Sequence, residues 1–171
     1  SRRRAVLRQA LDKGALPRAY DQNAYLAAGA GNLRALREEK IELGGMIAQV
    51  LPMPGHTPGS LGLWVTPQRL LLPGDNWNPM TWVFFPESET VSAYADTLRG
   101  LAHFPIDHVL TPHDPRLLFG RRFLRYIQGL TPRTFQAAYP LPIPSYPHIK
   151  TYACHPEPET TLVFDRDKWC Q

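Results

Sequence analysis

A short loop between two apolar segments constrains the fold of this chain more than any other feature. Residues 53–60 read MPGHTPGS, so His56 lies between a Pro-Gly pair and a Thr-Pro-Gly triplet. Proline fixes φ and glycine permits tight turns, which makes this loop short and stiff. Residues 46–53 before it are apolar apart from Gln49, a pattern that predicts a strand covered on both faces. His56 is therefore expected where a strand ends, a position that metal ligands often take.

The residues after this loop predict an antiparallel meander. Leu61, Leu63 and Val65 alternate with Gly62, Trp64 and Thr66, which is the period of a strand. A turn at residues 66–68 then leads into residues 69–73, and the three segments are short enough to pair in sequence order.

Apolar residues at helical spacing predict helices over residues 3–12, 22–28 and 117–130, with another that Asn32 caps around Leu33 and Leu36. A further helix is expected after Ser88, a plausible N-cap. Residues 74–86 are expected to form a loop, residues 107–111 a strand and residues 112–115 a rigid loop. The remaining predicted segments are an extended Pro-rich stretch over 139–147 and closing strands over 149–153 and 160–164.

Two further polar residues follow apolar segments in the same way as His56. Asp75 ends the segment LLLPGD and His113 ends HVLTPH, so all three side chains can reach one rim of a sheet. Two imidazoles and a carboxylate form a ligand set suited to Zn, Fe or Mn. Taken singly, either histidine has an ordinary loop role and Asp75 an ordinary turn-capping role. The three together favour a metal site.

The segments MPGHTPGS, LLLPGD and HVLTPH, in this order and with a helix between the last two, resemble three motifs of the metallo-β-lactamase superfamily. The resemblance is strong over residues 41–115, and the ending TTLVFDRDKW is similar to the closing strand of some members. It implies an α/β fold: half of an αβ/βα sandwich, with a mixed or antiparallel sheet and helices on one face. It also implies that His56 is a ligand of a first metal and His113 of a second, and that Asp75, the catalytic residue, bridges both.

This sequence departs from the family pattern in three places. Asp114 follows His113 where the family most often has glycine, and would accept hydrogen bonds or restrict the loop. Asn76 occupies a position where small or hydroxyl residues are common. The HxHxDH motif of the family, which supplies the other ligands, does not occur in the sequence. Each metal would then keep two protein ligands, one fewer than catalytic zinc sites normally use.

The function implied by the resemblance is hydrolysis of a thioester, lactone, amide or phosphodiester by a metal-bound hydroxide. We expect two zinc ions, or iron or manganese, in the intact site, and a glyoxalase-II or lactonase type of activity. We also expect the 171-residue chain to be an incomplete form that binds metal weakly and is inactive alone. The alternative is a non-catalytic fragment or interaction module without a functional metal centre.

Four aromatic residues follow Asp75 closely and are candidates for the wall of a substrate pocket: Trp77, Trp82, Phe84 and Phe85. Such a wall would suit an apolar or acyl-bearing substrate. The alternative for each ring is that it packs beneath the helix that follows Ser88.

The composition predicts one domain, with a helical lead-in over 1–40, the metal-ligand sheet and helices over 41–138, and the Pro-rich segment and closing strands over 139–171. The formal charge of +4 permits nucleic-acid binding, but no aromatic residues interleave with the arginines, so no nucleic acid is expected. Without a long apolar segment we expect no membrane contact and a cytoplasmic protein acting on a small molecule. Because the central sheet is apolar on both faces, we expect a missing amino-terminal half or a second copy to cover one face.

Overall fold

The computed structural model describes residues 2–14, 16, 20–29 and 39–169. It divides into two compact units, residues 1–37 and 38–171. The first unit contains α1 (Arg2–Asp12) and α2 (Gln22–Ala27), which confirms the two predicted helices. Asp21 caps α2 by accepting a hydrogen bond of 2.9 Å from the backbone N–H of Ala24. The helix predicted after Asn32 lies outside the described residues.

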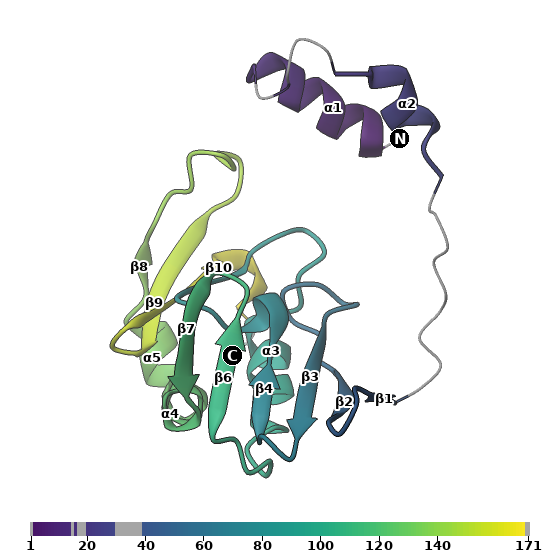
Figure 1. Ribbon diagram of the computed structural model, residues 1–171. Coiled ribbons are helices and arrows are strands. Elements are labelled where there is room, and N and C mark those ends of the chain that lie inside the picture. The colour runs from purple at the N-terminus through teal and green to yellow at the C-terminus, as the bar shows by residue number, and fades with distance from the viewer. Residues whose placement is uncertain (1, 15, 17–19, 30–38, 170–171) are drawn as a thin grey trace. The chain divides into compact units, whose positions relative to one another are not determined.

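The second unit contains a six-stranded mixed sheet (Figure 1). The meander predicted after residue 46 is confirmed, because β2, β3 and β4 pair antiparallel in sequence order. The connection from β4 to β6 runs through a helix, and these two strands are parallel. In spatial order the strands are β1 (Lys40–Glu42), β2 (Ile47–Pro52), β3 (Leu61–Thr66), β4 (Leu70–Leu72), β6 (His108–Thr111) and β7 (Asp114–Phe119).

A second sheet of four strands was not predicted. Its order is β5 (Met80–Val83), β10 (Thr160–Asp165), β9 (Thr151–Glu157) and β8 (Tyr139–Pro140). The closing strands were predicted, but residues 74–86 were wrongly expected to be a loop and instead contain η1 (Gly74–Asn76) and β5. β5 forms because it pairs in parallel with β10, about 80 residues later in the chain, and local sequence does not reveal such a partner. The fold class, mixed α/β, is confirmed.

Three helices complete this unit: α3 (Val91–Arg99), α4 (Gly120–Gly129) and α5 (Pro132–Gln136). The N-cap of α3 is Thr90, whose hydroxyl accepts from Ala93 N, and not Ser88 as predicted. α4 begins at Gly120 rather than near residue 117, since the preceding residues pair with β6 as strand β7. The rigid loop predicted over 112–115 is for the same reason only a turn before Asp114.

The helices α3 and α4 share one hydrophobic core with both sheets. Trp64, Leu71 and Val109 enter it from one face of the six-stranded sheet, and Leu162 and Phe164 enter it from the four-stranded sheet. Figure 1 shows α3 behind the strands of the larger sheet. This core fixes the ends of the strands, from which the loops of the candidate site emerge.

The opposite face of the six-stranded sheet is apolar and partly open. Side chains alternate along a strand, so the neighbours of the core-facing residues point away from the helices. Among them Leu61 is 48% exposed, and Leu117 and Phe119 are each 56% exposed. Residues 46–53, predicted to be covered on both faces, are buried or half-buried apart from Pro52, so the open part of this face lies on β3 and β7.

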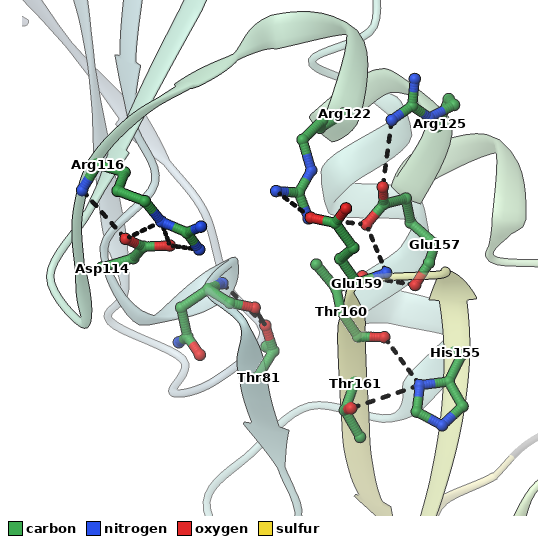
Figure 2. A network of polar contacts seen from close by, with 11 residues as sticks. Thr81, Asp114, Arg116, Arg122, Arg125, His155, Glu157, Glu159, Thr160 and Thr161 are labelled. Carbon is green, nitrogen blue, oxygen red and sulfur yellow. Dashed lines mark hydrogen bonds and ion pairs between the residues drawn. The ribbon is translucent and has the colours of Figure 1, made fainter.

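Ion pairs join α4 to the end of β9 (Figure 2). Arg122 and Arg125 donate to the two carboxylate oxygens of the buried Glu157, at 3.1 and 3.2 Å. Burial raises the pKa of Glu157, but the hydrogen bonds from the two guanidinium groups outweigh it and leave this pKa below its ordinary value.

The helices of the described residues are all too short or too polar to span a lipid bilayer.

Candidate metal centre

Three loops bring the predicted ligands to one pocket. His56 comes from the loop between β2 and β3, Asp75 from η1 after β4, and His113 from the turn between β6 and β7. All three line a cavity of about 530 Å³. Its remaining lining residues are Asn78, Pro79, Met80 and Trp82.

The Asp75 carboxylate lies between the two imidazoles. Its Oδ1 is 3.0 Å from Nε2 of His113, and its Oδ2 is 4.0 Å from Nε2 of His56. Each carboxylate oxygen therefore faces a different ring, and both rings present the same nitrogen. Because an ionised carboxylate only accepts, Nε2 of His113 donates the hydrogen bond in the shorter of these two contacts.

The ring of His56 is held in one orientation. Its Nδ1 is 2.7 Å from the backbone carbonyl of Trp82, on β5. A carbonyl only accepts, so Nδ1 carries a proton, and in the neutral ring the lone pair that a metal needs is then on Nε2. The ring of Phe85 also meets the imidazole edge to face, with centroids 5.2 Å apart.

The backbone of His56 is fixed at both its polar groups. Its N–H donates to Oδ1 of Asn76 at 2.9 Å, and its carbonyl accepts from the hydroxyl of Ser88 at 2.7 Å. The Asn76 side chain also donates to Met53 O at 2.6 Å and is fully buried. A side chain at Gly55 would meet this amide at 2.6 Å, so glycine is required there.

A buried hydrogen-bond chain supports the turn that carries Asp75. The hydroxyl of Tyr94, on α3, donates to Asn76 O at 2.7 Å, and it lies 2.9 Å from the hydroxyl of Tyr126, on α4. Burial raises the pKa of both hydroxyls, so both stay protonated and able to donate. Gly74 has a φ of +57°, in the left-handed region that favours glycine, and this bend turns Asp75 toward the pocket.

His113 is held less firmly, although the residue after it is fixed. Its side chain is 65% exposed. The carboxylate of Asp114 accepts from the backbone N–H of Arg116 and from its guanidinium at 2.7–3.1 Å (Figure 2). These hydrogen bonds lower the pKa of Asp114 to about 2. Asp114 is thus a hydrogen-bond acceptor, and its effect on the loop of His113 stays a prediction.

The ligand atoms of the site are of types that bind metals, but few ligand residues are grouped there. Imidazole Nε2 atoms with a carboxylate match zinc and iron, and the tautomer of His56 is the one that ligation needs. Within the described residues, however, no three or more His, Cys, Asp or Glu side chains are grouped so that they could hold a metal ion. The site therefore offers suitable chemistry without a complete three-ligand cluster in this part of the chain.

The four aromatic candidates for the pocket wall are placed differently. Trp82 lines the cavity, and Phe85 packs on His56. Trp77 is fully buried against Phe123, with ring centroids 5.3 Å apart, and Phe84 is fully buried in a second apolar cluster. Trp77 and Phe84 therefore pack in the interior, which is the alternative to a place in the pocket wall.

Sequence reasoning missed the rest of the lining. Asn78, Pro79 and Met80 reach the cavity because they lie between η1 and β5 or at its start. Asn78 caps this bend by accepting from Met80 N at 2.9 Å. The pair Asn78-Pro79 is a common turn signal that could have marked the bend, and the β-branched and aromatic residues 81–85 after it are typical of a strand.

Solved structures are similar to parts of this chain. ETHE1 from Myxococcus xanthus is 23% identical over 54% of this chain and 43% of that one, with a TM-score of 0.43. A metallo-β-lactamase superfamily protein from Sulfolobus tokodaii is 18% identical, over 64% of this chain and 43% of that one, with a TM-score of 0.43. A metallo-β-lactamase family protein from Thermus thermophilus is 18% identical, over 74% of this chain and 47% of that one, with a TM-score of 0.44.

Two of these three structures are described as proteins of the metallo-β-lactamase family or superfamily. This is the superfamily that the sequence motifs resemble. The chain spans less than half the length of each of the three structures. No family model and no curated protein matches the sequence.

Proposed function

We propose that this chain forms part of a metal-dependent hydrolase, in which His56 and Asp75 would be ligands of one divalent metal, and Asp75 and His113 ligands of a second. The observation that carries the proposal is the position of Asp75, whose two oxygens face the Nε2 atoms of the two histidines. A bound zinc or iron ion would lower the pKa of water and stabilise negative charge on the substrate oxygen. The substrate would be a thioester, a lactone or another acyl compound.

The residues of the chain would act by binding and orientation. His56 keeps Nε2 directed into the cavity because Nδ1 donates to Trp82 O. Pro79, Met80 and the ring of Trp82 form an apolar wall beside the ligands, which supports an acyl-bearing substrate. Met80 is 47% exposed, so it can contact a substrate without rearrangement of the core.

Zinc titration of the chain, purified without chelators, tests the metal site. We expect weak binding that Asp75→Ala abolishes, because both histidines would lose the carboxylate between them. Asp107→Ala is the matched control: Asp107 is an exposed aspartate paired with Arg69, and its loss should leave binding unchanged. Zinc binding that survives Asp75→Ala would contradict the proposal, and one tightly held zinc per chain would contradict weak binding.

A panel of thioesters and lactones, assayed with the longest natural form of the chain, tests the reaction. Hydrolysis that a chelator stops and zinc or iron restores would support the proposal. The alternative function, a non-catalytic interaction module, is favoured by the small number of grouped ligands among the described residues. Zinc-independent folding together with no turnover of any substrate would favour that alternative.

We also propose that a second polypeptide, an amino-terminal half or a second copy, covers the open sheet face. The apolar side chains of Leu61, Leu117 and Phe119 on this face are about half exposed, which soluble monomers rarely tolerate over a large area. Size-exclusion chromatography with light scattering and mass spectrometry tests this. A dimer or a co-purifying fragment would support it, and a stable monomer without any second chain would contradict it.

A further inference from the structure

The side chain of Lys168 closes a loop beside the candidate metal centre. Lys168 belongs to η2 (Arg166–Lys168), which follows β10. Its ammonium donates to three backbone carbonyls, those of Phe85, Pro86 and Ser88. An ammonium has three N–H donors, so this one group matches three acceptors from a stretch of four residues.

The loop that Lys168 closes touches His56 twice. The Ser88 hydroxyl accepts from Phe85 N at 3.1 Å and donates to His56 O at 2.7 Å. The Phe85 ring meets the imidazole of His56 edge to face. The residues whose carbonyls surround the ammonium are thus the residues that fix the backbone and one side of the ring.

Three carbonyls directed at one point repel each other unless a cation lies between them. Without the ammonium, residues 85–88 would need to turn these carbonyls toward water. That change would also move the Ser88 hydroxyl and the Phe85 ring, because both belong to the same short loop. The effect of Lys168 therefore extends to His56 through Ser88 and Phe85.

We propose that Lys168 is a positioning residue for His56, which holds the imidazole in the tautomer and orientation that metal binding needs. The effect of Lys168 on metal affinity rests on the proposed function. Its effect on the orientation of the His56 ring does not. Groups that orient a metal ligand typically change metal affinity or activity by about 10–100-fold. We expect about a tenfold loss of zinc affinity when the ammonium is removed, within that range.

The test compares three single variants and one double variant. Lys168→Met keeps an unbranched stem and removes the ammonium, and Ser88→Ala removes the hydroxyl that reaches His56. Lys150→Met is the matched control, because Lys150 is exposed. Zinc affinity is measured by competition with a chromophoric chelator. The tautomer of His56 is measured in the metal-free chain from the nitrogen NMR shifts of its ring, at a mildly alkaline pH.

We expect both single variants to weaken zinc binding about tenfold and to lower the Nδ1–H fraction of His56, with no change in Lys150→Met. Since Lys168 acts through the loop that carries both Ser88 and Phe85, the double variant should lose less than the sum of the two single losses. Additive losses would contradict the relay. Lower unfolding free energy with unchanged tautomer and zinc affinity would show a merely structural role. If the parent chain binds no zinc, the proposed metal site is contradicted. The nitrogen NMR shifts of the His56 ring then still show whether Lys168 positions the imidazole.

Discussion

The two histidines of the candidate site differ in how firmly the fold holds them. The His56 side chain is 21% exposed, its ring donates to Trp82 O, and both its backbone polar groups are bonded. The His113 side chain is 65% exposed and pairs with Asp75. Both follow a strand and both face the same carboxylate, so their different environments come from the packing around each loop. A ligand held in advance loses little freedom on binding, whereas His113 must be ordered by what binds.

The elements behind each loop explain this difference. The loop of His56 lies against Asn76, Ser88 and β5. Asn76 is held by α3, Ser88 by Lys168 and β5 by β10. The turn of His113 lies at one edge of the six-stranded sheet, where Arg116 holds Asp114. One side of the site is thus supported by a core and the other by a local ion pair.

The largest expected effect is on the His56 side. Asn76→Ala leaves His56 N and Met53 O without their partner, and each buried unsatisfied group costs about 1–3 kcal/mol. We expect the free energy of unfolding to fall by about 2–4 kcal/mol in urea denaturation. Gln128→Ala, an amide removed from an exposed position of α4, should change it by less than about 0.5 kcal/mol. If Asn76→Ala and Gln128→Ala lowered the free energy of unfolding by similar amounts, Asn76 would not support the His56 side of the site as described.

A smaller effect distinguishes the two rings directly. His56→Ala loses the hydrogen bond to Trp82 O and the contact with Phe85, so we expect a loss of about 1–2 kcal/mol of stability. His113→Ala removes an exposed ring and should cost less than about 0.5 kcal/mol. Chemical denaturation of both variants, without metal, measures the difference. The two sides would be equally supported if both substitutions had the same cost.

The smallest effect concerns Asp114, on the His113 side. Its pKa of about 2 in the folded chain lies below the ordinary value of 3.8, because the hydrogen bonds from Arg116 favour the carboxylate. A lowered pKa stabilises the fold above pH 3.8, and this contribution is lost as the pH falls from there to about 2. We expect the stability of the parent chain to fall more steeply than that of Asp114→Asn over this interval, measured by urea midpoints. Since Arg116 is exposed, the difference should be small. Parallel pH profiles would contradict it.

Much of the sheet and the place of the ligands could be predicted from the sequence. The meander follows from alternating apolar residues between close turns, and its strands pair in sequence order. The residues His56, Asp75 and His113 each end such an apolar segment, which brings them to one cavity. That they bind metal stays a prediction. The start of α4 was missed, because apolar residues 117–119 suit a helix and a strand alike until β6 is in place.

The sequence alone determined which residues end the strands and which chemistry they bring to the rim, because local turns and apolar periodicity are short-range properties. Only the tertiary structure decided how each ligand is held. Strand β5 exists through its pairing with β10, and Lys168 reaches carbonyls about 80 residues away along the chain. Such contacts depend on the closure of long loops, and no local pattern of residues records them.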